Sequence, residues 1–149
     1  MAETFADFAL NRQILNAIEE KGYLQPTPIQ QKAIPSILSG QDVMGIAQTG
    51  TGKTAAYVLP LIMKIKFAQG NDPRALILVP TRELAIQVKE NVDQYSKYTD
   101  LRNLAIYGGT GTKPQIEALE KGIDILIATP GRLLDLYLDG HDNRPIKRR

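Results

Sequence analysis

The chain has 149 residues, a usual size for one domain, and 43 % of them are hydrophobic, enough for a packed core. It has no cysteine, which excludes disulfides and thiolate metal sites. The net charge of +2 does not predict nucleic-acid binding, because residues 144–149 form a basic tail with four of the 18 basic residues, and the rest balances 14 basic against 16 acidic. No apolar run could span a bilayer and no signal peptide is visible, so we expect a cytoplasmic protein without membrane contact.

Helix and strand patterns alternate along the chain. Helices are predicted over residues 11–21, from 28 onward, and over 53–67, 83–95, 114–120 and 132–138; strands are predicted over 42–47, 75–79, 104–107 and 123–128. We expect Pro35 to kink or end its helix and a break near Pro60. Residues 75–79 are apolar throughout, which is typical of a parallel strand buried on both faces. The alternation predicts an α/β fold with a parallel sheet flanked by helices.

The most informative stretch is the loop after the first predicted strand, Ala-Gln-Thr-Gly-Thr-Gly-Lys-Thr at residues 47–54. Its predicted phosphate-binding residues are Gln48, Thr49, Gly50, Thr51, Gly52, Lys53 and Thr54. The two glycines let the backbone N–H groups turn toward phosphate oxygens, and the following helix adds the positive end of its dipole. Lys53 can reach the β- and γ-phosphates, and the Thr54 hydroxyl can ligate Mg²⁺. Ala47 stands where the general pattern has glycine.

Two other interpretations of this loop are weaker. A plain turn would also collect glycine and threonine, but it would not need the flanking strand and helix patterns. A dinucleotide-binding turn fits Gly50, Gly52 and Ala55 loosely. That fold needs an acidic residue at the end of the next strand, whereas residues 79–81 are Val-Pro-Thr. The lysine directly after the last glycine also favours a nucleoside triphosphate.

Further distinctive loops follow the other strands, at residues 80–83, 108–109 and 129–132, where ligands gather in parallel sheets. With residues 22–30, Gly-Tyr-Leu-Gln-Pro-Thr-Pro-Ile-Gln, they carry a family resemblance. The chain resembles the N-terminal part of the first RecA-like domain of a DEAD-box ATP-dependent RNA helicase. Residues 5–30 are similar to its Q-motif region, 47–54 to motif I, 80–84 to motif Ia, 108–109 with Gln115 to the double-glycine element, and 129–132 to motif Ib.

The resemblance implies ATP and Mg²⁺ as cofactors. A glutamine amide can pair with adenine N6 and N7, and Gln30 stands at that position of the Q motif. The resemblance makes Phe5 the aromatic that stacks on the purine, although a plain core role is the alternative. Tyr23 is undecided between the site and the core, and Phe8 is expected in the core.

The resemblance also implies RNA as the second ligand, held by its sugar–phosphate backbone and therefore without strong sequence preference. The implied RNA-binding residues are Pro80, Thr81, Arg82, Gly108, Gly109, Thr129, Pro130, Gly131 and Arg132. Taken alone, Thr129, Pro130 and Gly131 would also fit an ordinary helix start.

Hydrolysis in this family uses an Asp-Glu-Ala-Asp motif, which the 149 residues lack. Residues 143–147 resemble the approach to it. We therefore expect residues 1–149 to form a partial RecA-like P-loop domain, incomplete at its C-terminal end. It would bind ATP and RNA, with negligible hydrolysis by itself, and its protein partner would be the remainder of the helicase, or it would have none. The alternative is a non-catalytic nucleotide- and RNA-binding module.

The absent strand belongs inside the family's sheet, so we expect an unpaired edge, an exposed apolar strip, lower stability and a tendency to associate. For the basic tail, truncation or a frame change is favoured over an evolved RNA-binding segment.

Overall fold

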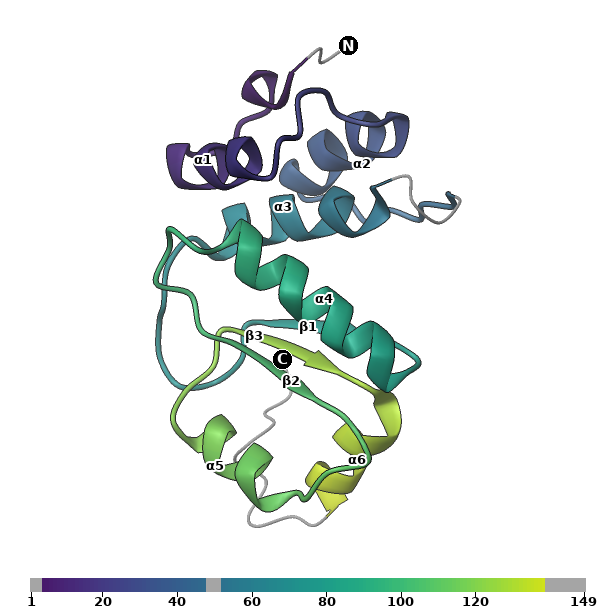
Figure 1. The fold of residues 1–149 in the computed structure, drawn as a ribbon, viewed down its shortest axis with the longest axis vertical. Coiled ribbons are helices and arrows are strands. Elements are labelled where there is room, and N and C mark those ends of the chain that lie inside the picture. The colour runs from purple at the N-terminus through teal and green to yellow at the C-terminus, as the bar shows by residue number, and fades with distance from the viewer. Residues whose placement is uncertain (1–3, 48–51, 139–149) are drawn as a thin grey trace. The chain divides into compact units, whose positions relative to one another are not determined.

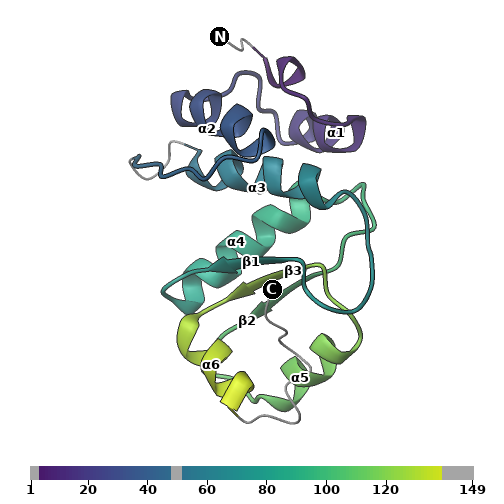
Figure 2. The ribbon, with the colours of Figure 1, turned by 180° about the vertical axis from the view of Figure 1, so that it is seen from behind.

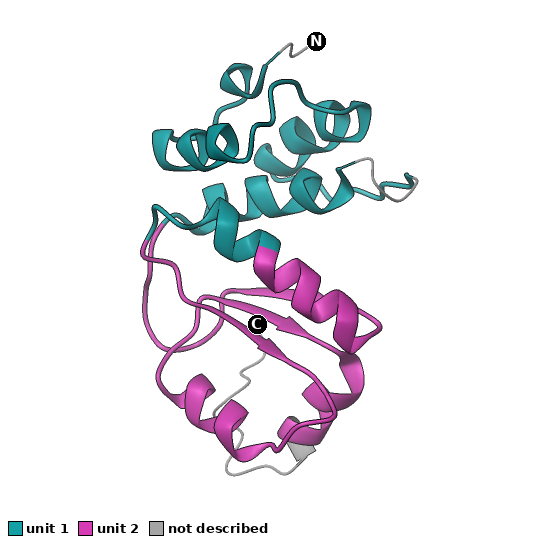
Figure 3. Ribbon diagram, viewed as in Figure 1, with its two compact units in different colours: residues 1–66, 91–99 teal, residues 67–90, 100–149 magenta. Residues whose placement is uncertain are grey.

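The computed structural model of the chain describes residues 4–47 and 52–138 (Figure 1, and from behind in Figure 2). It divides into two compact units, residues 1–66 with 91–99 and residues 67–90 with 100–149 (Figure 3). We call them unit 1 and unit 2. No helix in the described ranges is both long enough and apolar enough to cross a membrane.

Unit 1 is helical. It contains the short 3₁₀ helix η1 (Phe5–Asp7), α1 (Arg12–Glu20), α2 (Pro28–Leu38), α3 (Lys53–Ile65) and the last part of α4 (Arg82–Tyr95). The start of α1 is as predicted, because Asn11 Oδ1 accepts a hydrogen bond from the Ile14 N–H at 2.9 Å. Gly22 follows the end of α1 with a φ of +77°, a backbone conformation that favours glycine.

The two internal prolines do not end their helices. α2 continues through Pro35 to Leu38, and α3 continues through Pro60 to Ile65, so an early end at Pro35 and a break near Pro60 were wrong, while a kink at Pro35 stays a prediction. Each proline removes one helical hydrogen bond, but α2 packs against α3, and Ile34 and Ile62 are fully buried. Tertiary burial therefore outweighs the local cost of proline in both helices.

The predicted strand over residues 42–47 was also wrong. Residues 41–47 form neither helix nor strand, and the side chains of Met44 and Ile46 are 91 % and 90 % exposed. The segment has the composition of a buried strand, but a strand also requires a paired backbone. None of the described strands pairs with it.

Unit 2 is built on a parallel sheet of β1 (Ala75–Leu78), β2 (Asn103–Ile106) and β3 (Ile125–Ala128) in the order β1-β3-β2. It also contains the first part of α4, α5 (Lys113–Glu120) and α6 (Pro130–Leu138). The parallel α/β architecture is as predicted. The register places Leu78, Ala128 and Ile106 side by side at the carboxyl ends of the strands, so the following loops start from one edge of the sheet.

The strands of unit 2 differ in burial. All four residues of β3 are buried, whereas in β1 Leu76 and Leu78 are 49 % and 54 % exposed. The expectation that residues 75–79 are buried on both faces was therefore wrong. Among the described strands β1 pairs with β3 alone, and no described strand covers Leu76 and Leu78 on its other side, so an unpaired edge there stays a prediction. Its tendency to associate stays a prediction.

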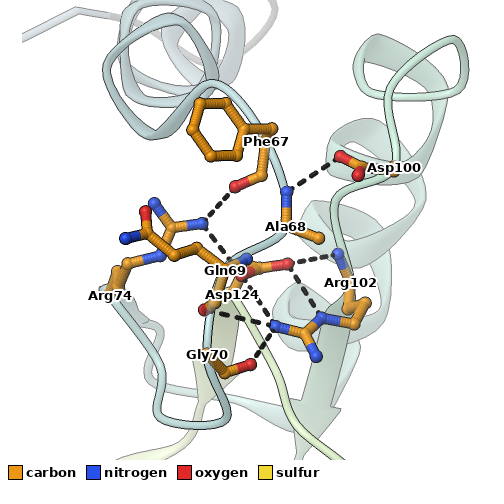
Figure 4. A network of polar contacts seen from close by, with 8 residues as sticks. All are labelled: Phe67, Ala68, Gln69, Gly70, Arg74, Asp100, Arg102 and Asp124. Carbon is orange, nitrogen blue, oxygen red and sulfur yellow. Dashed lines mark hydrogen bonds and ion pairs between the residues drawn. The ribbon is translucent and has the colours of Figure 1, made fainter.

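A buried carboxylate holds together the amino ends of the strands (Figure 4). Asp124 is fully buried and accepts hydrogen bonds from Arg74 Nη2 at 2.9 Å, and from Arg102 Nε and Nη2, both at 3.0 Å. The backbone N–H groups of Arg102 and Gln69 also donate to it. Burial opposes the charged form, but these hydrogen bonds hold the pKa of Asp124 well below its usual range. Asp124 therefore joins the loop before β1 to the starts of β2 and β3.

Candidate nucleotide and RNA sites

The predicted adenine-reading glutamine lies at the start of α2. Thr27 and Gln30 form a reciprocal cap, in which the Thr27 N–H donates to Gln30 Oε1 at 3.0 Å and the Gln30 N–H donates to Thr27 Oγ1 at 3.4 Å. Gln30 Nε2 also donates to the carbonyl of Gly52 at 3.1 Å. Gln30 is only 2 % exposed, and its amide connects the cap of α2 to Gly52 at the end of the predicted phosphate loop.

Gly52 occupies a position that excludes a side chain. Its φ of +83° lies in the left-handed region, and a Cβ there would come within 2.3 Å of Gln30 Nε2 and 3.1 Å of Thr27 Oγ1. The glycine is thus required both by the turn and by the close approach of Gln30. Four predicted loop residues, Gln48, Thr49, Gly50 and Thr51, lie outside the described residues, as does the basic tail.

The helix after the loop begins at Lys53, as predicted. Lys53 is exposed, while Thr54 is partly buried and its side chain hydrogen-bonds Tyr57. Burial raises the pKa of Tyr57, and the hydrogen bond with Thr54 partly offsets that rise. The N–H groups of the first turn of α3, together with the Lys53 ammonium and the Thr54 hydroxyl, suit a phosphate group.

The two candidate stacking aromatics have different surroundings. Phe5 is 4 % exposed, and its ring meets that of Phe8 edge to face with centroids 6.1 Å apart. Phe8 is buried, as predicted. Adenine stacking on Phe5 would require its ring face to become accessible, so that role stays a prediction.

Tyr23 is exposed, with Lys21 Nζ 5.4 Å from its ring centroid. The same ammonium lies 5.2 Å from the ring of buried Tyr95. Burial, and then the neighbouring Tyr23 hydroxyl, raise the pKa of Tyr95 above its usual range. Tyr23 therefore contacts protein groups at the ends of α1 and α4, and a contact with nucleotide stays a prediction.

The three predicted RNA-binding loops start side by side at the carboxyl edge of the sheet. Residues 80–82 lead from β1 into α4, where Thr81 Oγ1 accepts from the Leu84 N–H at 3.2 Å. Thr129 follows β3, and its N–H donates to the carbonyl of Ile106, the last residue of β2, at 3.1 Å. α6 begins at Pro130, so motif Ib is also a helix start.

Most of the predicted RNA-binding residues are accessible. Those that are exposed are Pro80, Thr81, Arg82, Gly109, Pro130 and Gly131, and those that are partly buried are Gly108, Thr129 and Arg132. The Arg82 guanidinium lies 5.3 Å from the Tyr107 ring centroid. Gly109 has a φ of +87°, and a Cβ there would be 2.8 Å from Arg82 Nη1. Nothing lies within 4 Å of a Cβ built on Gly131, so its surface is open.

Arg132 has protein partners in the double-glycine loop. Its Nη1 donates to Gln115 Oε1 at 3.2 Å and its Nη2 donates to the Thr110 carbonyl at 2.9 Å. Sequence reasoning identified Gln115 only as part of a motif and missed Tyr107 and Thr110.

It also missed Asp124, although a charged residue directly before an apolar strand was a usable signal. The arginines that surround it, Arg74 and Arg102, lie elsewhere in the sequence, and only the fold brings them together.

A parallel sheet flanked by helices, with a glycine- and lysine-containing sequence directly before α3, is the arrangement of a RecA-like domain. A model of the DEAD/DEAH box helicase family matches residues 27–148, and the chain belongs to that family.

Curated relatives support the same family assignment. The chain is 43 % identical over 143 residues to the ATP-dependent RNA helicase DBP2 of Encephalitozoon cuniculi, covering 93 % of this chain and 29 % of that protein. It is 49 % identical over 139 residues to the ATP-dependent RNA helicase dbp10 of Schizosaccharomyces pombe, covering 93 % of this chain and 16 % of that protein. The chain therefore spans less than a third of the length of these relatives.

A solved structure also agrees with the fold. The crystal structure of a DEAD box protein from the hyperthermophile Methanococcus jannaschii matches with a TM-score of 0.87 at 40 % identity, covering 98 % of this chain and 40 % of that one. The chain corresponds to a fragment of the first RecA-like domain of the family.

Proposed function

We propose that this chain is the ATP- and RNA-docking part of a DEAD-box RNA helicase and that it acts in the cytoplasm. The observation that carries the nucleotide half of the proposal is the contact between Gln30 and Gly52, which links the base-reading residue of the Q motif to the phosphate loop. The family's ATP-dependent RNA helicases supply the ligand identities.

The Gln30 amide keeps hydrogen-bonding capacity for a base, which would be used once this 2 % exposed residue becomes accessible to the base. A glutamine Nε2 carries two N–H groups and its Oε1 has two lone pairs, while Gly52 and Thr27 use one of each. The second N–H can donate to adenine N7 and the second lone pair can accept from adenine N6. Guanine has a carbonyl oxygen in place of the N6 amine, so the same amide would select ATP over GTP.

The start of α3 would hold the phosphates. Its first-turn N–H groups and the exposed Lys53 ammonium favour negative charge, and the Thr54 hydroxyl can provide one oxygen ligand to Mg²⁺. A bound Mg²⁺ would neutralise phosphate charge. To ligate Mg²⁺, the Thr54 hydroxyl must either keep its hydrogen bond with Tyr57 at the same time or break it.

The carboxyl edge of the sheet in unit 2 would hold RNA. Arg82, Thr81 and Thr129 carry donors suited to phosphate and sugar oxygens, and open Gly131 permits close approach of a backbone. Such contacts support binding with little sequence preference. ATP turnover by this chain alone would be negligible, because the 149 residues lack the Asp-Glu-Ala-Asp carboxylates that would help hold Mg²⁺ and position water.

Nucleotide titrations test the first half of the proposal. Gln30→Ala should weaken ATP binding roughly tenfold, because at least one hydrogen bond to the base is lost, while GTP binding changes less. Gln31→Ala is the matched control, since Gln31 lies on the same helix and donates to the Pro26 carbonyl instead of Gly52. Equal losses for ATP and GTP would show that Gln30 does not read the base.

ATP turnover tests the proposal that the chain docks its ligands without hydrolysing ATP. RNA-stimulated ATP hydrolysis by the chain should equal that of Lys53→Ala, within the background of the assay. Turnover well above that variant would contradict docking without hydrolysis.

A further inference from the structure

The loop between β2 and α5, residues 107–112, is held by side chains from three helices. Arg82 of α4 lies over the Tyr107 ring, Gln115 comes from α5 and Arg132 comes from α6. This loop carries the double glycine, and the left-handed φ of Gly109 makes its conformation specific. The contacts that determine the loop's shape therefore come from outside it.

Gln115 uses both N–H donors and one oxygen lone pair of its amide for this purpose. Nε2 donates to the Tyr107 carbonyl at 3.2 Å and to Thr110 Oγ1 at 3.0 Å, on either side of the two glycines. Oε1 accepts from Arg132 Nη1. An amide has two N–H donors, so Gln115 has none left for another ligand while these contacts persist.

The Arg132 guanidinium is also directed into the protein. Nη1 and Nη2 both donate within the loop network, and Nε is buried without a hydrogen-bond partner in the described part of the chain. Arg82 differs, because it is exposed and its guanidinium lies over the face of the Tyr107 ring. The two arginines of the RNA motifs thus stand in different environments.

We propose that Gln115 and Arg132 are positioning residues that hold the double-glycine loop in its RNA-binding shape. Arg132 contributes to RNA affinity through Gln115 and Thr110 and does not act as the charge partner of a phosphate. This proposal rests on the proposed RNA binding of unit 2. Arg82 then supplies the direct phosphate contact.

Salt dependence separates the two roles of an arginine. A lost phosphate contact lowers the slope of log affinity against log salt by about 0.7 for a single strand, whereas a misplaced loop lowers affinity without changing the number of neutralised phosphates. The probe is a single-stranded oligouridine bound to the full chain. Arg82→Met should reduce the slope, and Arg132→Met should leave it unchanged.

Three further variants make the test sharper. Gln115→Ala changes no charge, yet it should weaken RNA binding roughly 3- to 10-fold, and Arg132→Met should weaken it by a similar factor. Because both residues act through the same loop, the double variant should bind RNA as well as whichever single variant binds it less tightly. Arg132→Lys keeps the charge but loses the two-pronged geometry, so it should lose as much affinity as Arg132→Met. Full affinity in Arg132→Lys, or a reduced slope in Arg132→Met, would overturn the proposal.

Amide hydrogen exchange without RNA provides an independent readout. Residues 107–112 should exchange faster in Gln115→Ala and in Arg132→Met, and at the wild-type rate in Glu117→Ala, an exposed change on the same helix. Unchanged exchange in the first two variants would overturn the positioning role. Failure of the wild-type chain to bind oligouridine would overturn the proposed function and the RNA part of this inference, while exchange would still decide whether the two residues hold the loop.

Discussion

In unit 1 the residues predicted to bind nucleotide are held by contacts at the ends of two helices. In unit 2 the residues predicted to bind RNA lie in the loops that follow three paired strands. Gln30 and Gly52 meet because the cap of α2 lies against the start of α3. The loops of unit 2 start side by side because the register aligns Leu78, Ala128 and Ile106. The geometry of a site at helix ends depends on a few direct contacts between neighbouring residues. The geometry of a site at a sheet edge depends on the pairing of all the strands.

Asp124→Asn tests the dependence on the sheet and should have the largest effect. The change leaves Arg74 and Arg102 without their buried anionic partner, and breaking a buried ion pair costs about 3–5 kcal/mol. We expect a loss of that size in the free energy of unfolding of unit 2, measured by urea denaturation with hydrogen exchange on β3. A change below about 1 kcal/mol would show that the network does not hold the strands.

The pH dependence of the stability of unit 2 provides a second test of the Asp124 network. The pKa of Asp124 is lowered by folding, so its contribution is complete above the unfolded pKa of about 4 and is lost as pH falls toward the folded value. The stability of unit 2 should therefore fall below about pH 4, and more steeply in the wild type than in Asp124→Asn. Parallel curves for the two proteins would contradict the assignment.

Gly52→Ala tests the helix-end site. The new Cβ would clash with Gln30 Nε2 and sit at a left-handed φ, so we expect roughly 2 kcal/mol of destabilisation of unit 1 and loss of ATP binding. Gly40→Ala is the matched control, because its φ is also positive, at +89°, but only the flexible end of Lys64 lies nearby. Equal effects of the two changes on ATP binding would show that the approach of Gln30 is irrelevant.

Lys66→Gly should change the stability of the protein least among these variants, and it should raise the stability where the others lower it. Lys66 follows α3 with a φ of +73°, the only positive φ among the non-glycine residues that the structure describes. Glycine relieves that strain at some entropic cost, so we expect stabilisation by roughly 0.5–1 kcal/mol in thermal unfolding. Lys66→Ala keeps the Cβ and should not stabilise. Equal midpoints for both variants would show that the backbone is not strained there.

Much of the fold could be predicted from the sequence, because most elements depend on local patterns. The helix starts at Asn11, Pro28 and Lys53 follow from capping residues, proline and glycine. The three strands of the sheet and the helices between them are confirmed to within a few residues. Residues 42–47 and Pro35 were misjudged because strand pairing and helix packing, which the local pattern does not contain, decided them.

The sequence by itself determined the family and predicted the motif residues, since short ordered motifs depend only on residue type and spacing. The tertiary structure decided what those residues contact. It showed Gln30 bonded to Gly52, Phe5 buried against Phe8, and Arg132 bonded into the double-glycine loop. It also assembled the Asp124 network from three separate segments. Hydrogen bonds and burial join residues that are distant along the chain, and therefore only the folded arrangement could reveal them.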